Sequence, residues 1–248
     1  MKRNILITIP CLLTGGTEFQ TLNLVRALKS ANHTVTVCCY FEFADKMVDL
    51  YTLHGAEVVL FSNKKEQRPR GFRQISFLYK NLKKVVSKFK PDIAHVQYMA
   101  PGALPIFILK LLGVKKIIAT VHQPYTKRHG KLAKILVQTA AKLCSKFIVV
   151  SKNAEKSWFG SSALFNENIT LNKQPKHITI YNAVDISKIQ EIAKNVHIFQ
   201  EKDKLGILND KFVYADEDDK PIITGNGIST IDTLIKEYPN IFIKRPVI

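Results

Sequence analysis

Two adjacent glycines near the N-terminus are the first residues whose type and spacing suggest chemistry. Gly15 and Gly16 follow an isoleucine-rich run at residues 4–10, and a segment with apolar residues at helical spacing starts at Glu18. A backbone without Cβ atoms can approach a phosphate or a sugar closely, and the N-terminal end of a helix favours an anion there. The pattern indicates a turn that binds a phosphate or a sugar, and a simple tight turn is the alternative.

Three polar side chains follow other short apolar runs. His122, Ser151 and Asn182 each stand at or just after the end of a predicted strand. The carboxyl ends of parallel strands meet at one edge of a sheet, and ligands bind beyond that edge in open α/β folds. We therefore expect these side chains to converge with the glycine turn. The alternatives are a structural histidine, a helix cap at Ser151 and a turn at Asn182.

Strand-like and helix-like segments alternate along most of the chain. The predicted strands are residues 4–10, 34–41, 56–61, 93–97, 116–121, 147–151 and 178–181, and the predicted helices are residues 43–54, 72–90, 103–112, 132–144 and a segment capped by Asn153. This alternation predicts an α/β fold with a Rossmann-like, doubly wound parallel sheet that has helices on both faces. His95 lies inside one of the strands and is interpreted as a core histidine.

The charge is strongly basic and unevenly spread. The formal net charge is +17, and residues 1–196 hold 30 Lys and Arg against 11 Asp and Glu, whereas residues 197–248 hold 7 against 9. A field of this sign attracts polyanions or anionic lipid. Residues 64–90 hold ten basic residues and one acid, which suggests an anionic membrane surface as partner, with a solvated lysine face as the alternative. Nucleic-acid binding is disfavoured because the sequence contains no recognition motif and no aromatic residues interleaved with the basic runs.

The composition argues against several other classes of protein. The four cysteines form no C-x-x-C pair and no cluster has metal-ligand spacing, so we expect no metal and a reducing compartment. The sequence shows no signal peptide and no apolar run of about twenty residues, so a cytoplasmic location is expected. A dinucleotide-dependent oxidoreductase is disfavoured because G-x-G-x-x-G is absent after the first strand, and a serine hydrolase because G-x-S-x-G is absent.

Five short motifs, taken together, resemble a known family. In chain order they are G-G-T-E, K-P-D-I-x-H-x-Q, T-V-H, V-V-S and I-x-N-A-V-D. Their order and spacing resemble the N-terminal half of retaining, nucleotide-sugar-dependent glycosyltransferases with the GT-B fold, of the glycogen synthase-like or family 4 type. The resemblance covers about residues 4–190.

The resemblance implies roles for particular residues. Catalytic roles fall on His122, which would reach toward the transferred sugar, and on Glu18, whose alternative role is to stabilise the first helix turn by its charge. The implied substrate-binding residues are Gly15, Gly16 and Thr17 near the donor phosphates, Lys127 and Arg128 in the acceptor loop, and Ser151 and Asn182 toward the domain hinge. The implied donor is a UDP- or GDP-sugar, with no metal or other cofactor.

The resemblance also predicts the domain organisation. Residues 1–190 are expected to form the acceptor-side domain, and residues 191–248 a remnant or divergent start of the C-terminal domain, which in the family binds most of the sugar nucleotide. The roughly fifty residues after Val196 are too few for a second doubly wound domain of ordinary size. We therefore expect a truncated copy or a component that needs a separate donor-domain subunit.

The expected function is transfer of a sugar to a glycan or lipid-linked acceptor with retention of configuration. The expected context is cell-surface polysaccharide synthesis, at the inner face of the plasma membrane. The alternative is a non-catalytic truncated homologue that binds a membrane or a glycan.

Overall fold

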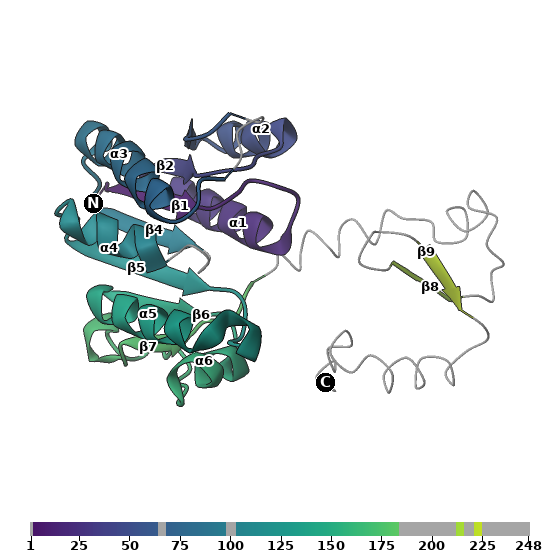
Figure 1. Ribbon diagram of the computed structural model, residues 1–248. Coiled ribbons are helices and arrows are strands. Elements are labelled where there is room, and N and C mark those ends of the chain that lie inside the picture. Colours follow the sequence, from purple (N-terminus) through teal and green to yellow (C-terminus); the bar gives the residue numbers. More distant parts are fainter. Residues whose placement is uncertain (1, 64–67, 98–102, 184–211, 216–220, 225–248) are drawn as a thin grey trace. The chain divides into compact units, whose positions relative to one another are not determined.

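A seven-stranded sheet organises the N-terminal part of the chain. The computed structural model describes residues 2–63, 68–97, 103–183, 212–215 and 221–224. The strand order is β3-β2-β1-β4-β5-β6-β7, and each neighbouring pair is parallel (Figure 1). The strands are β1 (Asn4–Ile9), β2 (Thr34–Cys39), β3 (Glu57–Leu60), β4 (Ile93–Gln97), β5 (Lys116–Val121), β6 (Lys146–Val149) and β7 (His177–Thr179). The predicted Rossmann-like, doubly wound α/β fold is confirmed.

The helices divide between the two faces of the sheet. Helices α1 (Gly16–Ser30) and α2 (Asp45–Leu53) connect β1 to β2 and β2 to β3, in one direction across the sheet. The helices that follow run in the opposite direction, from β3 back to β4 and on to β7. They are α3 (Phe72–Phe89), α4 (Ala103–Leu111), α5 (Gly130–Leu143) and α6 (Lys152–Phe159). Because such crossovers are right-handed, α1 and α2 cover one face and α3 to α6 cover the other.

Each face has its own hydrophobic core, which explains why the central strands are apolar on both sides. On one face Leu22 and Val25 of α1 pack with Tyr51 of α2 against alternate residues of β1 and β2. On the other face the larger core includes Leu82 of α3 and Trp158 of α6. Helix α4 contacts both α3 and α5, so these three helices form a layer (Figure 1).

The strand order reverses next to β1, and this reversal defines the place where a ligand is expected. The strand that follows β1 in the chain lies on one side of it, and β4 pairs with it on the other side. At such a point the connections leave the sheet in opposite directions, and a crevice forms beyond the carboxyl ends of the strands.

One local prediction is wrong. Helix α6 begins at Lys152, and its N-cap is Ser151, whose hydroxyl oxygen accepts a hydrogen bond from the Ala154 N–H at 3.2 Å. The predicted cap, Asn153, lies inside the first turn. Strand β6 ends at Val149, so the chain turns into the helix earlier than the sequence pattern suggested.

A second unit follows the sheet domain. The chain divides into Met1–Ala183 and Val184–Ile248. In the second unit β8 (Phe212–Ala215) and β9 (Pro221–Thr224) form an antiparallel pair. The predicted domain boundary at residue 190 lies outside the described residues and stays a prediction. Among the described helices, none has the length and apolar character needed to cross a bilayer.

Candidate functional site

A pocket of about 260 Å³ opens at the carboxyl edge of the sheet, beside the reversal of strand order. Helix α1 forms one wall, and the ends of β4, β5 and β6 and the residues after β7 form the floor and the other wall. The lining residues are Gln20, Asn23, Leu24, His95, Gln97, Thr120, His122, Ile148, Val150, Ile180, Tyr181, Asn182 and Ala183. The structure thus brings two of the predicted site residues, His122 and Asn182, into one pocket.

Four polar side chains of this pocket form a continuous hydrogen-bonded chain. His95 and Gln97 are two residues apart in β4, and Thr120 and His122 are two residues apart at the end of the adjacent β5, so all four point to the same face. The His95 Nε2 atom lies 2.8 Å from Thr120 Oγ1 and 3.3 Å from Gln97 Nε2, and the His122 Nε2 atom lies 3.0 Å from Gln97 Oε1.

The orientation of the Gln97 amide assigns the protons in this chain. The Gln97 oxygen can only accept a hydrogen bond, so His122 donates to it from Nε2–H. The Gln97 nitrogen donates to His95 Nε2. His122 therefore has its basic lone pair on Nδ1. Gln97 is the residue that connects the two histidines and holds the imidazole of His122 in one orientation.

Both histidines are uncharged at neutral pH. Burial lowers the pKa of His122 to about 4. Burial, together with the nearby His122, lowers the pKa of His95 to about 4 as well. A group with so low a pKa is a weak general base at pH 7. The arrangement is therefore suited to hydrogen bonding with a polar ligand such as a sugar hydroxyl, rather than to proton transfer.

The presence of glycine at position 15 is explained by local packing, without a ligand. Gly15 is the N-cap of α1, and a Cβ atom there would lie 2.6 Å from Glu18 Oε2. Glu18 is only 8% exposed, and its Oε1 accepts a hydrogen bond from Cys11 Sγ at 3.3 Å. Burial and the Glu18 carboxylate raise the pKa of the Cys11 thiol to about 12, so this cysteine stays protonated.

The turn lies outside the group of residues that line the His122 pocket. Gly15, Gly16, Thr17 and Glu18 precede the three α1 residues that form the pocket wall. The Thr17 carbonyl accepts a hydrogen bond from Thr21 Oγ1 at 2.8 Å, and the Glu18 carbonyl accepts one from the Tyr51 hydroxyl at 2.6 Å. Their predicted roles at the donor phosphates stay predictions.

The two glycines are expected to respond oppositely to alanine. Gly15→Ala should lower the free energy of unfolding by about 1 kcal/mol, because the new methyl group displaces a buried carboxylate. Gly16→Ala should raise it by about 0.4–1 kcal/mol, because Gly16 is helical, no described atom lies within 4 Å of its added Cβ, and alanine loses less backbone entropy. Urea denaturation of both variants measures the difference, and an equal effect at the two positions would contradict this account.

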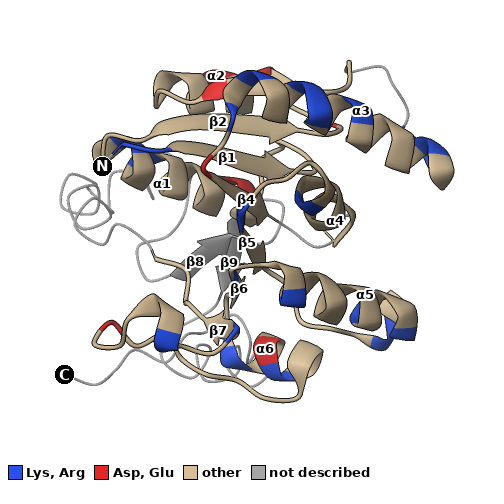
Figure 2. Ribbon diagram, turned by 90° about the vertical axis from the view of Figure 1, so that its left-hand side faces the viewer, with Lys and Arg blue, Asp and Glu red and all other residues tan. Residues whose placement is uncertain are grey.

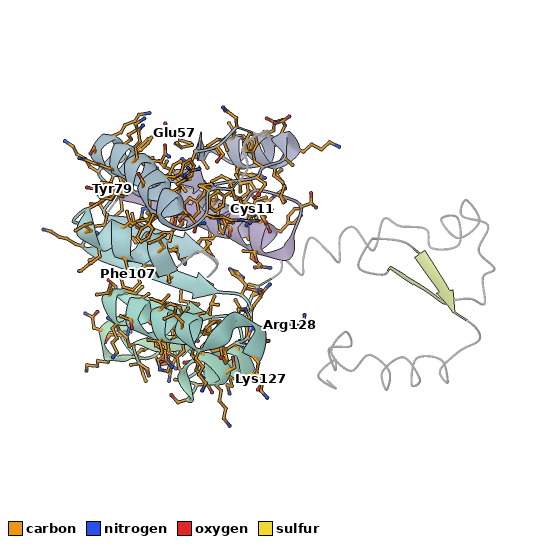
Figure 3. All side chains as sticks on the ribbon, viewed as in Figure 1. Cys11, Glu57, Tyr79, Phe107, Lys127 and Arg128 are labelled. Atoms are coloured by element: carbon orange, nitrogen blue, oxygen red, sulfur yellow. The ribbon has the colours of Figure 1, made fainter. Side chains whose placement is uncertain are left out.

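Lys127 and Arg128 line a second hollow, of about 550 Å³, at the same end of the domain (Figure 3). They form the short 3-10 helix η1 (Lys127–His129), which follows the loop after β5. The loop is held in place because its Tyr125 N–H donates to Ser157 Oγ at 2.8 Å and the Tyr125 ring packs edge-on against Trp158. The structure therefore presents two exposed cations on a well-anchored loop.

Ser151 lines neither the pocket nor the hollow. Its hydroxyl caps α6, which is the alternative role that the sequence left open. The adjacent Val150 does line the pocket.

Sequence reasoning missed three polar residues of the pocket. His95 was interpreted as a core residue, and Gln97 and Thr120 received no role. His95 is indeed buried, yet it also lines the pocket. The signal that could have found the pair is the two-residue spacing of His95 and Gln97, which places both side chains on one face of a strand that ends at the ligand edge.

The sequence identifies the family to which this domain belongs. Residues 14–160, which are more than half of the chain, match the family described as Glycosyltransferase Family 4. The chain therefore belongs to this glycosyltransferase family, as the five motifs predicted. No curated protein matches the sequence.

Solved structures show the same fold at low sequence identity. A glycosyltransferase from Rickettsia africae ESF-5 is 17% identical, with a TM-score of 0.58 over 84% of this chain and 50% of that one. The UDP-GlcNAc 2-epimerase from Neisseria meningitidis, solved with UDP-GlcNAc, is 14% identical, with a TM-score of 0.54 over 83% and 52%. Anabaena Alr3699/HepE, solved with UDP and glucose, is 13% identical, with a TM-score of 0.52 over 79% and 50%. The chain spans about half the length of these structures.

Proposed function

We propose that this chain takes part in the transfer of a sugar from a UDP- or GDP-sugar to a glycan or lipid-linked acceptor. The observation that carries the proposal is the pocket at the carboxyl edge of the sheet, in which Gln97 holds the uncharged His122 as a hydrogen-bonding group. Family membership and the nucleotide and sugar bound in the Anabaena structure support it.

The proposed roles of the residues come from the family resemblance, and the pocket positions of His122 and Asn182 support theirs. His122 hydrogen-bonds a hydroxyl of the transferred sugar, and Asn182, on the same pocket, contacts the same ligand. Lys127 and Arg128 bind the acceptor, whose phosphate groups they would attract if it is lipid-linked. Gly15, Gly16 and Thr17 lie nearest the donor phosphates, Glu18 acts beside them, and Ser151 orients the segment before the hinge.

Transfer with retention of configuration is the proposed stereochemical outcome. The acceptor attacks from the face that the nucleoside diphosphate leaves, so the site must stabilise the negative charge that develops on the diphosphate. We propose that residues 1–190 form the acceptor-side domain and that residues 191–248 begin the donor side. A separate donor-domain subunit is the proposed source of further groups that bind the diphosphate.

The proposed setting is cell-surface polysaccharide synthesis, at the cytoplasmic face of the plasma membrane. The basic charge of residues 1–196 supports this location because anionic lipids are concentrated there. A lipid-linked acceptor would be presented at the same surface.

Isothermal titration with UDP, GDP and their common sugars tests the proposed function. We expect saturable binding at physiological salt, and about tenfold weaker binding by His122→Ala, because the variant loses one hydrogen bond to the sugar, about 1.4 kcal/mol. The matched control is His33→Ala, since His33 lies at the opposite edge of the sheet, where its Nδ1 accepts from the Arg3 N–H. Absence of binding up to millimolar concentrations would contradict the proposal.

The alternative function is that of a non-catalytic homologue that binds a membrane or a glycan. It is favoured by the strongly basic charge of residues 1–196, which attracts anionic lipid whether or not a nucleotide binds. Retention on anionic vesicles without nucleotide binding in the titration would support this alternative.

A further inference from the structure

We propose that the outer surface of α5 docks on an anionic lipid bilayer. The inference deepens the proposed function and rests on the membrane location proposed there. It assigns the contact to helix α5, whereas the sequence predicted it for the basic run at residues 64–90, which includes helix α3. We call the residues concerned the α5 surface: Leu132, Ile135 and Leu136 with Lys127, Arg128, Lys131 and Lys142.

Helix α5 has an apolar stripe on the side that faces away from the core. Its buried residues are Val137, Ala140 and Ala141, which pack toward the sheet. Leu132, Ile135 and Leu136 are 69%, 57% and 42% exposed, and their spacing of three and four residues places them on one stripe. A helix that needed only its inner face for folding would carry polar residues at these outer positions.

Basic residues accompany this stripe, and acidic residues are absent from it. Lys131 and Lys142 are exposed and lie three turns apart on the same side of the stripe. Residues 93–154 contain ten Lys and Arg and neither Asp nor Glu. Figure 2 shows blue segments and no red along α3, α4 and α5, whose sequences carry no acidic residue.

Charge and apolarity together decide which partner fits this surface. A second copy of the chain would bring an equally basic surface against it, and like charges repel. A nucleic acid would neutralise the lysines, but its phosphates offer nothing to leucine and isoleucine side chains. An anionic bilayer suits both the aliphatic and the basic residues of the α5 surface. The aliphatic side chains enter the headgroup boundary, while the lysines bind the lipid phosphates.

The location of the α5 surface fits the proposed reaction. Helix α5 starts directly after η1, which carries Lys127 and Arg128 at the end of the domain where the strands point (Figure 3). A protein that rests on the bilayer through α5 holds this loop at the membrane surface. The headgroup of a lipid-linked acceptor can then reach the hollow that these two cations line.

Vesicle sedimentation of the full chain tests the inference. The probes are vesicles of phosphatidylcholine alone and of phosphatidylcholine with about 30% phosphatidylglycerol, whose anionic headgroups give the vesicle a negative surface potential. We expect binding to the anionic vesicles only. The double variant Lys131→Gln/Lys142→Gln should partition about 30-fold less at low salt, and the triple variant Leu132→Ser/Ile135→Ser/Leu136→Ser at least about tenfold less.

The matched control is Lys46→Gln/Leu53→Ser on α2, which covers the other face of the sheet. Leu53 is 78% exposed, so the control removes an exposed charge and an exposed aliphatic side chain without touching α5. It should bind vesicles as the parent chain does, and all variants should keep the parent's urea midpoint.

Three results would overturn the inference. The first is equal binding to neutral and anionic vesicles, and the second is an equal loss in the α2 control. The third is undiminished vesicle binding by the triple serine variant. Binding would then depend on charge alone, and the aliphatic residues that distinguish a bilayer from a nucleic acid as partner would have no role. Titration of the same variants with UDP separates the two proposals: vesicle binding without UDP binding would refute the transferase function and leave the α5 surface standing.

Discussion

Replacing Glu155 with alanine is expected to lower the free energy of unfolding by about 3–5 kcal/mol, the largest effect that the structure predicts for one residue. Glu155 is completely buried on α6. Its carboxylate accepts hydrogen bonds from His177 Nδ1 at 2.6 Å, Thr179 Oγ1 at 2.5 Å and the Ala163 N–H at 3.1 Å. The alanine variant leaves these three donors without their acceptor in a site where little water can replace it.

The three donors explain why one side chain has so large an effect. His177 and Thr179 belong to β7, the edge strand, and Ala163 lies in the loop between α6 and β7. Glu155 therefore ties the last helix and the last strand together. The His177 ring also stacks on Phe159, so loss of the carboxylate disturbs an aromatic contact as well.

Urea denaturation at pH 7 measures this effect, and Glu167→Ala is the matched control. Glu167 is an exposed carboxylate in the same loop region, so its loss should change the free energy of unfolding by no more than about 0.5 kcal/mol. A loss below about 1 kcal/mol in Glu155→Ala would show that the buried carboxylate does not hold β7 to α6.

The fold was largely predictable because its determinants are local. Strands β4 and β5 have the bounds predicted from their apolar runs, and the turn before β4 is marked by Pro91 and Asp92. Each run is short, apolar and bounded by polar residues. This pattern is typical of a strand that is buried on both faces of a parallel sheet. The order of elements then determined the two helical layers through the handedness of the crossovers.

The polar interactions were less predictable because they join residues that are distant in sequence. Glu155 reads as an ordinary helix surface residue in KNAEKSW, and only β7, more than twenty residues later, supplies the donors that explain its burial. The role of Glu18 at a ligand stays a prediction, and the structure adds that its carboxylate accepts a hydrogen bond from Cys11 Sγ. In both cases the sequence specifies the residue type, but the partner depends on tertiary packing.

The histidine pair shows the same limit inside the candidate site. The alternation in β4 predicts which face His95 occupies, and a buried face suggests a core residue. The structure adds that α1 does not cover this face completely at the carboxyl edge, so a pocket remains. Whether a buried side chain also meets a pocket depends on the length and tilt of the covering helix, which periodicity does not predict.

Lowering the pH from 6.5 to 4 is expected to reduce the free energy of unfolding by about 3 kcal/mol through His95 alone. Burial lowers the pKa of His95 from 6.5 to about 4, so between these values the unfolded chain binds a proton that the folded chain does not. Stability therefore falls as the pH falls through this window, and it is at its full value above pH 6.5. His122 acts in the same direction, and its partial exposure makes its contribution smaller.

Urea denaturation at several pH values, in the parent chain and in His95→Gln, isolates the effect of this group. Glutamine cannot gain a proton, so the variant should lose less stability between pH 6.5 and 4 than the parent does, by about 3 kcal/mol. His95→Asn, a second uncharged side chain that cannot gain a proton, controls for the choice of substituent and should show the same pH dependence as His95→Gln. If the free energy of unfolding had the same pH dependence in the parent and in His95→Gln, His95 would bind a proton in the folded chain as readily as in the unfolded chain. The hydrogen-bonded chain through Gln97 would then have to be oriented differently, with His122 accepting rather than donating at Nε2.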